Sequence, residues 1–272
     1  MPDCPAIRVI ASPSANLQTG FPPALRSVPH SIVQIEHSEG AEFDAVFRDV
    51  SIVFHDGPAI HPQEEAMSIV IIDAAKAAGV DHFILCSVFQ PMRTKLRTHQ
   101  TKLRIEEYLV ESRLSYTILQ PPNFMQNIPL DAVLSSGLIP TGFSTSVAHG
   151  FVDLNDVSLV ARKVILDPAR HNLAQYELVG ENISYDEITS MLSRISRRNI
   201  QCEVLTPTEF VARLRLSGEV RTEYAEDSLV RMLVYYDRWG LVGNSNALKW
   251  LLGREPTKWE AYAQRELFAN LH

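Results

Sequence analysis

Residues 74–87 read AAKAAGVDHFILCS, and this stretch decides the fold class. Its alanine-rich half favours a helix, and Gly79 lies just past the expected end, where a left-handed cap residue is common. Phe83 to Cys86 are apolar on both parities, which is typical of a strand buried on both faces. A helix that leads directly into such a strand predicts a parallel sheet with helices on both faces.

The same alternation extends on both sides of this stretch. Strands are predicted at residues 7–12, 32–36, 51–55, 82–87 and 116–120. Helices are predicted between them, at residues 21–28, 41–48, 63–78 and 98–112. The sequence therefore predicts an α/β protein with a Rossmann-like, doubly wound parallel sheet.

After Pro121 the pattern changes. We predict a helix at residues 123–132, a loop over the site at 135–150, a strand at 150–154, a helix at 155–166, a strand at 175–179 and a helix at 185–196. Asn155 is a candidate N-cap, and Ser184 with Glu187 has the spacing of a capping box. We expect residues 1–150 to form the core and residues 151–272 a smaller, mostly helical substrate-side lobe packed on it.

Composition excludes several classes of protein. The chain has 272 residues, 46% of them hydrophobic, and a formal charge of -7, which disfavours nucleic-acid binding. Cys4, Cys86 and Cys202 form no C-x-x-C pair, and the histidines show no ligand spacing, so we predict neither metal nor disulfides. With no leader peptide and no apolar run of about 20 residues, we expect a cytoplasmic protein without membrane contact.

Several motifs together resemble the NmrA-like family, an atypical branch of the short-chain dehydrogenase/reductase fold. The segments are residues 74–84 (AAKAAGVDHFI), 86–88 (CSV), 99–109 (HQTKLRIEEYL), 116–127 (YTILQPPNFMQN), 151–157 (FVDLNDV) and 176–180 (YELVG). The tail segments 236–244 (YDRWGLVGN) and 252–256 (LGREP) resemble fungal members. The resemblance covers roughly residue 50 to the end and implies a fold built to hold a dinucleotide.

The first turn departs from this family. Its G-x-x-G-x-x-G glycines fall on Ser12, Ala15 and Gln18, and Pro13 removes a backbone N–H from the same loop. The glycines normally allow a tight turn and the close approach of the backbone to pyrophosphate. We therefore expect a degenerate dinucleotide site and no bound cofactor.

A second departure concerns the strand that normally reads the adenosine ribose. Residues 32–36 resemble the third strand of the family, so the second is expected to be missing and the sheet truncated at its N-terminal edge. In an alternative register, Glu36 is the ribose-reading acid, about 20 residues after the turn. A mis-predicted exon or a decayed gene would also explain both departures.

The resemblance also supplies catalytic candidates. Lys102 matches the lysine of the Tyr-x-x-x-Lys pair of the wider fold, Thr98 replaces the tyrosine, and Ser87 matches the serine at a strand end. His99 lies one helical turn before Lys102, so we predict that His99 and Lys102 act as acid–base catalysts. The alternative is a solvated helix lysine near Glu106.

Substrate-binding candidates follow the predicted strands. Ser87, Asn123, Gln126 and Asn127 come where open α/β sheets bind ligands, and Tyr236 belongs to an aromatic stretch suited to wall an apolar pocket. Capping by Asn123 and core packing by Tyr236 are the alternatives.

From these features we expect a cofactor-independent, non-redox enzyme. It would isomerise, dehydrate, cyclise or perform aldol-type chemistry on a small apolar natural-product intermediate. One alternative is a regulatory NmrA-like binding protein without turnover, and another is an NAD(P)H-dependent reductase with a rebuilt phosphate loop. A homodimer or a regulatory protein partner is compatible with either role.

Overall fold

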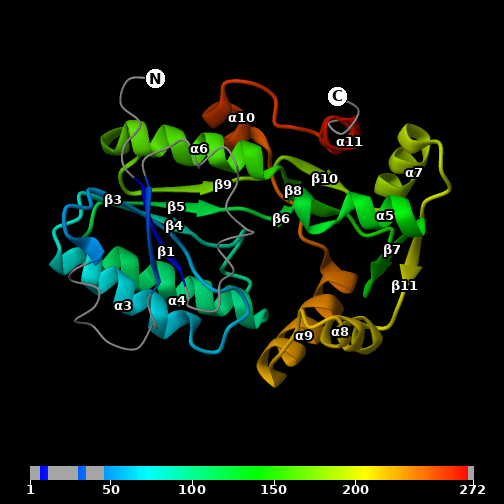
Figure 1. Cartoon of the computed structure of the whole chain (residues 1–272), viewed down its shortest axis with the longest axis horizontal. Coiled ribbons are helices and arrows are strands. Elements are labelled where there is room, and N and C mark those ends of the chain that lie inside the picture. Colours follow the sequence, from blue (N-terminus) through cyan, green and yellow to red (C-terminus); the bar gives the residue numbers. More distant parts are fainter. Residues whose placement is uncertain (1–6, 12–29, 35–45, 269–272) are drawn as a thin grey trace.

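A computed structural model describes residues 7–11, 30–34 and 46–268. The main sheet has the order β3 (Ile52–Asp56), β4 (His82–Cys86), β5 (Tyr116–Gln120) and β9 (Ala174–Glu177), and every neighbouring pair is parallel. The helices α3 (Glu64–Ala77) and α4 (Arg97–Ser112) cover one face, and α6 (Leu154–Leu166) and α10 (Asn246–Leu252) lie on the other (Figure 1). The predicted α/β, Rossmann-type parallel sheet is confirmed.

The apolar residues of the central strands pack into two hydrophobic cores, one on each face of the main sheet. All five residues of β4 and all five of β5 are buried. Phe83 and Leu85 pack with residues of α3 and α4, whereas Ile84 packs with residues of α6 on the opposite face. Successive side chains of a strand point to opposite faces, so a strand covered on both sides is mostly apolar, and its buried polar residues need partners, as His82 and Thr117 find in each other.

The N-terminal strands form a separate pair. β1 (Ile7–Ala11) lies parallel to β2 (His30–Gln34), with Val9 opposite Ile32. The Arg8 guanidinium donates to the carbonyl groups of Val46 and Arg48. The two predicted strands are thus present with slightly different bounds. The turn with Ser12, Pro13, Ala15 and Gln18, the predicted helix at 21–28 and Glu36 lie outside the described residues, so the missing strand stays a prediction.

The chain beyond residue 120 builds two small sheets and most of the right-hand part of Figure 1. The strands are β6 (Asn123–Phe124), β7 (Leu138–Thr141), β8 (His149–Val152), β10 (Glu181–Ile183) and β11 (Gln201–Val204). The helices are η2 (Met125–Asn127), α5 (Leu130–Ser136), η3 (Pro168–His171), α7 (Tyr185–Ser196), α8 (Pro207–Leu216), α9 (Glu223–Trp239) and α11 (Trp259–Phe268). β9, which follows residue 150 in the chain, joins the main sheet. The expected boundary at residue 150 between a core and a smaller lobe stays a prediction.

The helix predicted at residues 123–132 is wrong. Asn123–Phe124 form β6, Met125–Asn127 form the short 3-10 helix η2, and α5 starts only at Leu130. The reason is Pro129, because a proline disfavours helical geometry at the residue before it. Ile128 accordingly has extended angles, φ -100° and ψ 104°.

Of the two predicted helix N-caps, one is confirmed and one is wrong. Ser184 caps α7, and its capping box with Glu187 is complete. Asn155 is not the N-cap of α6. Asp153 takes that place, and its carboxylate accepts a hydrogen bond from the Asn155 N–H. The helix therefore begins at Leu154, and a charged cap replaces the predicted amide at its positive end.

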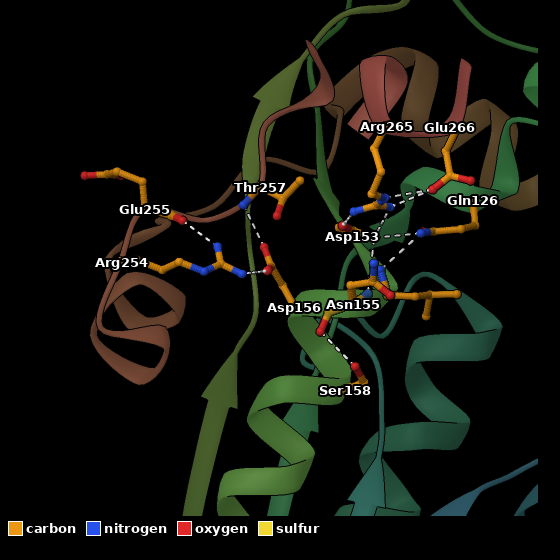
Figure 2. A network of polar contacts seen from close by, with 11 residues as sticks. Gln126, Asp153, Asn155, Asp156, Ser158, Arg254, Glu255, Thr257, Arg265 and Glu266 are labelled. Atoms are coloured by element: carbon orange, nitrogen blue, oxygen red, sulfur yellow. Dashed lines mark hydrogen bonds and ion pairs between the residues drawn. The ribbon is translucent and has the colours of Figure 1, made fainter. Parts of the chain in front are cut away.

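Two buried aspartates at the start of α6 hold the C-terminal segment (Figure 2). Arg265 contacts Asp153 at 2.6 Å, and Arg254 contacts Asp156 at 2.6 Å. Both carboxylates are 0% exposed. Burial by itself would raise the pKa of Asp153, but hydrogen bonds from Arg265, Gln126 and the Asn155 N–H outweigh it and hold that pKa below its usual range.

This contact should dominate the attachment of α11. We expect Arg265→Ala to lower the free energy of unfolding by about 3 kcal/mol, because it leaves the buried Asp153 carboxylate without its cation. Arg194→Ala is the matched control, since it removes an exposed ion pair to Glu260 on the same helix and should cost under about 1 kcal/mol. Urea unfolding measures both, and equal losses would contradict this view of Asp153.

Candidate active site

Helix α4 buries an unusually polar face. Its buried residues are His99, Lys102, Ile105, Glu106, Leu109 and Ser112, at the three- and four-residue spacing of one helical stripe. Three of them are ionisable, where a purely structural helix would bury aliphatic side chains. The contacts of this face run to the last residues of β4 and β5, so the polar groups gather at the carboxyl edge of the main sheet, where open α/β sheets bind ligands.

Lys102 is buried and paired. Its ammonium lies 2.8 Å from Oε1 of Glu64, the first residue of α3, and donates to the carbonyl oxygen of Cys86 at 3.2 Å. Lys102 is 8% exposed and Glu64 2%. The alternative of a solvated lysine that pairs with Glu106 is therefore wrong, because the salt-bridge partner comes from a different helix.

Glu106 is the second buried carboxyl group of the cluster. Both of its oxygens accept from the Gln120 amide, at 3.0 and 3.1 Å. Burial raises the pKa of Glu106 above its ordinary value, although the hydroxyl of Ser87, the Gln120 amide and the charge of Lys102 partly offset the rise. Ser87 Oγ is buried and has no hydrogen bond of ordinary geometry to any described residue.

His99 is almost wholly buried, and its Nδ1 lies 3.0 Å from the carbonyl oxygen of Gln90. Burial lowers the pKa of His99, so the imidazole is neutral near pH 7. Gln90 has φ +53°, a left-handed conformation that is uncommon outside glycine. The contact shows that His99 helps to hold the loop after β4, while its predicted role in proton transfer stays a prediction.

The three amides predicted to bind substrate have different surroundings. The Asn123 amide donates to the carbonyl oxygen of Gly150 at 3.2 Å. The Gln126 side chain contacts Asp153 at 2.7 Å and accepts from the Leu154 N–H, so both ends of its amide belong to the network of Figure 2. Asn127 is exposed. None of these contacts excludes a ligand, and a substrate role for the three stays a prediction.

Tyr236 belongs to an aromatic cluster with Phe143, His149 and Tyr185. The ring of His149 lies 4.7 Å from Phe143, 5.2 Å from Tyr236 and 6.3 Å from Tyr185. His149 is 1% exposed, neither of its nitrogens has a hydrogen-bond partner among the described residues, and burial lowers its pKa to about 4. The cluster is thus a packed group of aromatic rings around a neutral imidazole.

Sequence reasoning missed Glu64 and His149, and it treated Glu106 only as a surface partner of Lys102. The spacing of His99, Lys102 and Glu106 along one helical face was the available signal for Glu106. No sequence signal pointed to Glu64, because α3 and α4 are separated in sequence by β4 and come together only in the folded protein. Within the described residues, no group of three or more His, Cys, Asp or Glu side chains could hold a metal ion.

Across the part of the chain that the structure describes, no helix has both the length and the apolar character that crossing a bilayer demands.

Burial, with a further contribution from Asp56, raises the pKa of the Cys86 thiol to about 12. That thiol is therefore protonated and unreactive near neutral pH.

A parallel α/β sheet with a lysine and a serine at its carboxyl edge belongs to the dehydrogenase/reductase type of fold. The profile of the NmrA-like family matches residues 26–268, and the chain therefore belongs to the NmrA-like family. The family that the motifs indicated is thus confirmed, over a longer stretch than those motifs covered.

Relatives include the agroclavine dehydrogenase of Claviceps fusiformis, 28% identical over 193 residues, which are 67% of this chain and 63% of that protein. The chain spans less than two thirds of the length of the first curated relatives it matches.

Two solved structures show the same fold. The NADPH-dependent quinone oxidoreductase QOR2 of Escherichia coli, in complex with NADPH, has a TM-score of 0.78 and 22% identity, covering 96% of this chain and 90% of its own. NmrA, a negative transcriptional regulator in complex with NAD, has a TM-score of 0.74 and 14% identity, covering 97% and 96%.

These comparisons correct the expectation of a cofactor-independent, non-redox isomerase, lyase or cyclase. The relatives are named as a dehydrogenase and as reductases that use NAD(P)H. The expectation rested on the replaced glycines at residues 12–18, which lie outside the described residues. The carboxyl edge of the sheet keeps both Ser87 and Lys102, the residues that match the serine and the lysine of the wider fold.

The buried ion pair makes a double-variant test possible. We expect Lys102→Met to lower the free energy of unfolding by about 3 kcal/mol, because Glu64 is left charged and buried. Adding Glu64→Leu should recover most of that loss, since an apolar pair carries no desolvation cost. Lys76→Met, on the exposed side of α3, is the control in urea unfolding. A Lys102 variant no worse than the control would contradict the pair.

His149 should make the protein sensitive to acid. Its folded-state pKa of about 4 lies below the ordinary 6.5, so the unfolded state takes up the proton first as the pH falls from 6.5 toward 4. This group should therefore cost about 2 kcal/mol of stability at pH 5, relative to pH 8. His149→Phe, which keeps the ring contacts, should abolish that part of the loss in urea unfolding at the two pH values. An unchanged pH dependence would show that His149 is not buried as described.

Proposed function

We propose that the chain is an NAD(P)H-dependent reductase of a small, largely apolar substrate. The observation that carries the proposal is the set of polar groups at the carboxyl edge of the main sheet, with Lys102 held at 3.2 Å from the last carbonyl of β4 and Ser87 next in sequence. The named activities of the relatives support it.

The described residues fit the nicotinamide end of such a cofactor. Lys102 and Ser87 stand at the strand ends that face a ligand in open α/β sheets, and an ammonium there suits the hydroxyl groups of a ribose. Glu64 would share Lys102 with that ribose, since it contacts the same ammonium. Bound NAD(P)H would supply a hydride. The residues that would hold the pyrophosphate and adenosine lie outside the described part of the chain.

The aromatic cluster supports an apolar substrate. Phe143, Tyr185 and Tyr236 surround His149, and Tyr236 packs with Phe89 in the loop that follows β4 and Ser87. Flat aromatic walls favour flat substrates through stacking and burial of apolar area. A quinone or a polycyclic natural product would suit a site beside these rings, and a highly charged substrate would not, because charge is costly to bury.

Cofactor binding and turnover test this proposal in two steps. We expect calorimetry to show NADPH or NADH binding in the micromolar range, and a quinone added to that complex to oxidise the dinucleotide. Lys102→Met should weaken dinucleotide binding, whereas Lys76→Met should not. No binding of either dinucleotide by the wild-type protein would contradict the proposal.

The structural likeness to NmrA supports a second candidate, a dinucleotide-binding regulator without turnover. Thr98 in place of the tyrosine of the wider fold favours it, because a regulator does not need the phenol. Tight dinucleotide binding with no oxidation by a panel of quinones, together with a stoichiometric protein partner in pull-down, would favour this candidate over the reductase.

A further inference from the structure

A cavity of about 490 Å³ lies between α6, η3, β9 and α10, and we call it the α6–α10 cavity. The helices α6 and α10 lie on one face of the main sheet, whereas α4, which carries Lys102, covers the other (Figure 1). The described residues that line the cavity include none of the candidate active site. Its volume falls within the range of ligand pockets, roughly 300 to 1,000 Å³.

Part of the cavity wall is basic. Lys163 of α6 and Arg170 and His171 of η3 line it. The exposed Arg170 guanidinium has neither a hydrogen bond nor an ion pair among the described residues, so its N–H donors are open to a ligand. Burial lowers the pKa of His171, and the charges of Arg170 and Lys163 lower it further, against the opposing charge of Asp167. The imidazole is thus neutral near pH 7, and Lys163 and Arg170 supply positive charge to this wall.

The wall is held together without a ligand. The Lys163 ammonium donates to the carbonyl oxygens of Leu251 and Leu252 at the end of α10. An ammonium has three N–H donors, so one of them is left for a ligand. Elsewhere in the wall, Nδ1 of His171 lies 2.9 Å from the Tyr176 hydroxyl group. These contacts join α6 to α10 and η3 to β9, so the cavity is preformed.

The rest of the wall is apolar and includes an uncovered indole. Ala247, Trp250 and Leu251 line the cavity from α10, at the three- and four-residue spacing of one helical face. Trp250 is 76% exposed, and its ring has no aromatic or cation–π contact among the described residues. Trp239 is also exposed, but the Arg238 guanidinium lies 5.0 Å from the centre of its ring. An uncovered indole beside a basic wall suits a flat ring that carries negative charge.

We propose that the α6–α10 cavity binds a planar aromatic anion, a flat ring system that carries a carboxylate or a phosphate group. The anionic group pairs with the Arg170 guanidinium, whose planar fork matches carboxylate and phosphate oxygens, and with the remaining donor of Lys163. The ring stacks on Trp250. The site is independent of the proposed reductase function, because it shares no described residue with the candidate active site.

Fluorine-19 NMR of protein labelled with 5-fluorotryptophan tests the site, because the chain has three tryptophans. Trp250→Phe and Trp239→Phe assign two resonances, and the third is that of Trp259. We expect 2-naphthoate to shift the Trp250 resonance with a saturable midpoint below about 1 mM. The resonances of Trp239 and of the buried Trp259 should stay in place.

Trp239 is the stringent control, since it is exposed and also lies beside an arginine. A Trp239 shift as large as that of Trp250, or a Trp250 shift that does not saturate, would overturn the proposal. A Trp250 resonance that moves on dilution of the protein without ligand would do the same, because it would show that a second copy of the chain covers the cavity.

Two related probes define the chemistry of the ligand. We expect 2-naphthyl phosphate to bind as well, and its affinity relative to 2-naphthoate shows which anion the site prefers; either order supports the proposal. The neutral 2-naphthalenemethanol should bind at least about 10-fold more weakly, because it cannot form a charged pair with the guanidinium. Binding of the alcohol as tightly as both anions would contradict an anion site.

Variants locate the binding energy, with calorimetry of 2-naphthoate as the readout. We expect Arg170→Gln and Trp250→Leu each to weaken binding at least about 10-fold. Arg162→Gln is the control, because it removes an exposed arginine of α6 that does not line the cavity, and it should bind as the wild type does. Both replaced cavity residues are exposed, so their urea midpoints should stay near the wild-type value. Unchanged affinity in Arg170→Gln, or an equal loss in Arg162→Gln, would overturn the proposed site.

Discussion

A buried charge needs a partner, and this requirement shapes the candidate active site. Lys102 lies in the interior at the carboxyl edge of the sheet, and the Glu64 carboxylate and the Cys86 carbonyl replace the water it has lost. That pairing joins α3 to α4 across the ends of the strands. Glu106, in the same cluster, has the Gln120 amide as its hydrogen-bond partner, and burial raises the pKa of Glu106 above its ordinary value.

The same requirement acts at the far side of the sheet. Asp153 and Asp156 are fully buried at the start of α6, and Arg265 and Arg254 reach them from the C-terminal segment (Figure 2). The C-terminal segment with α11 is thus tied to the start of α6 by charge-assisted hydrogen bonds.

The elements that depend on neighbours in sequence were predicted correctly. The apolar run around Phe83, the strand at Tyr116–Gln120 and the capping box of Ser184 each depend on neighbours in sequence, and each was found. The helix predicted at residues 123–132 was wrong because Pro129 holds Ile128 in an extended conformation, which the apolar pattern of the segment does not reveal. The non-redox expectation was wrong: it was drawn from the replaced glycines of the first turn, the expected loss of the second strand and Thr98 in place of the tyrosine, and the named relatives are a dehydrogenase and NAD(P)H-dependent oxidoreductases.

The sequence by itself determined the fold class and the family, and it indicated Lys102 and Ser87, since these follow from periodicity and from motifs that are continuous in the chain. Only the tertiary structure decided that Lys102 pairs with Glu64, that Glu106 is buried against Gln120, and that His149 stands neutral among aromatic rings. The reason is physical: burial and the identity of a partner are properties of groups that meet across the fold. They set protonation through desolvation and Coulomb interaction, neither of which is written in the spacing of residues.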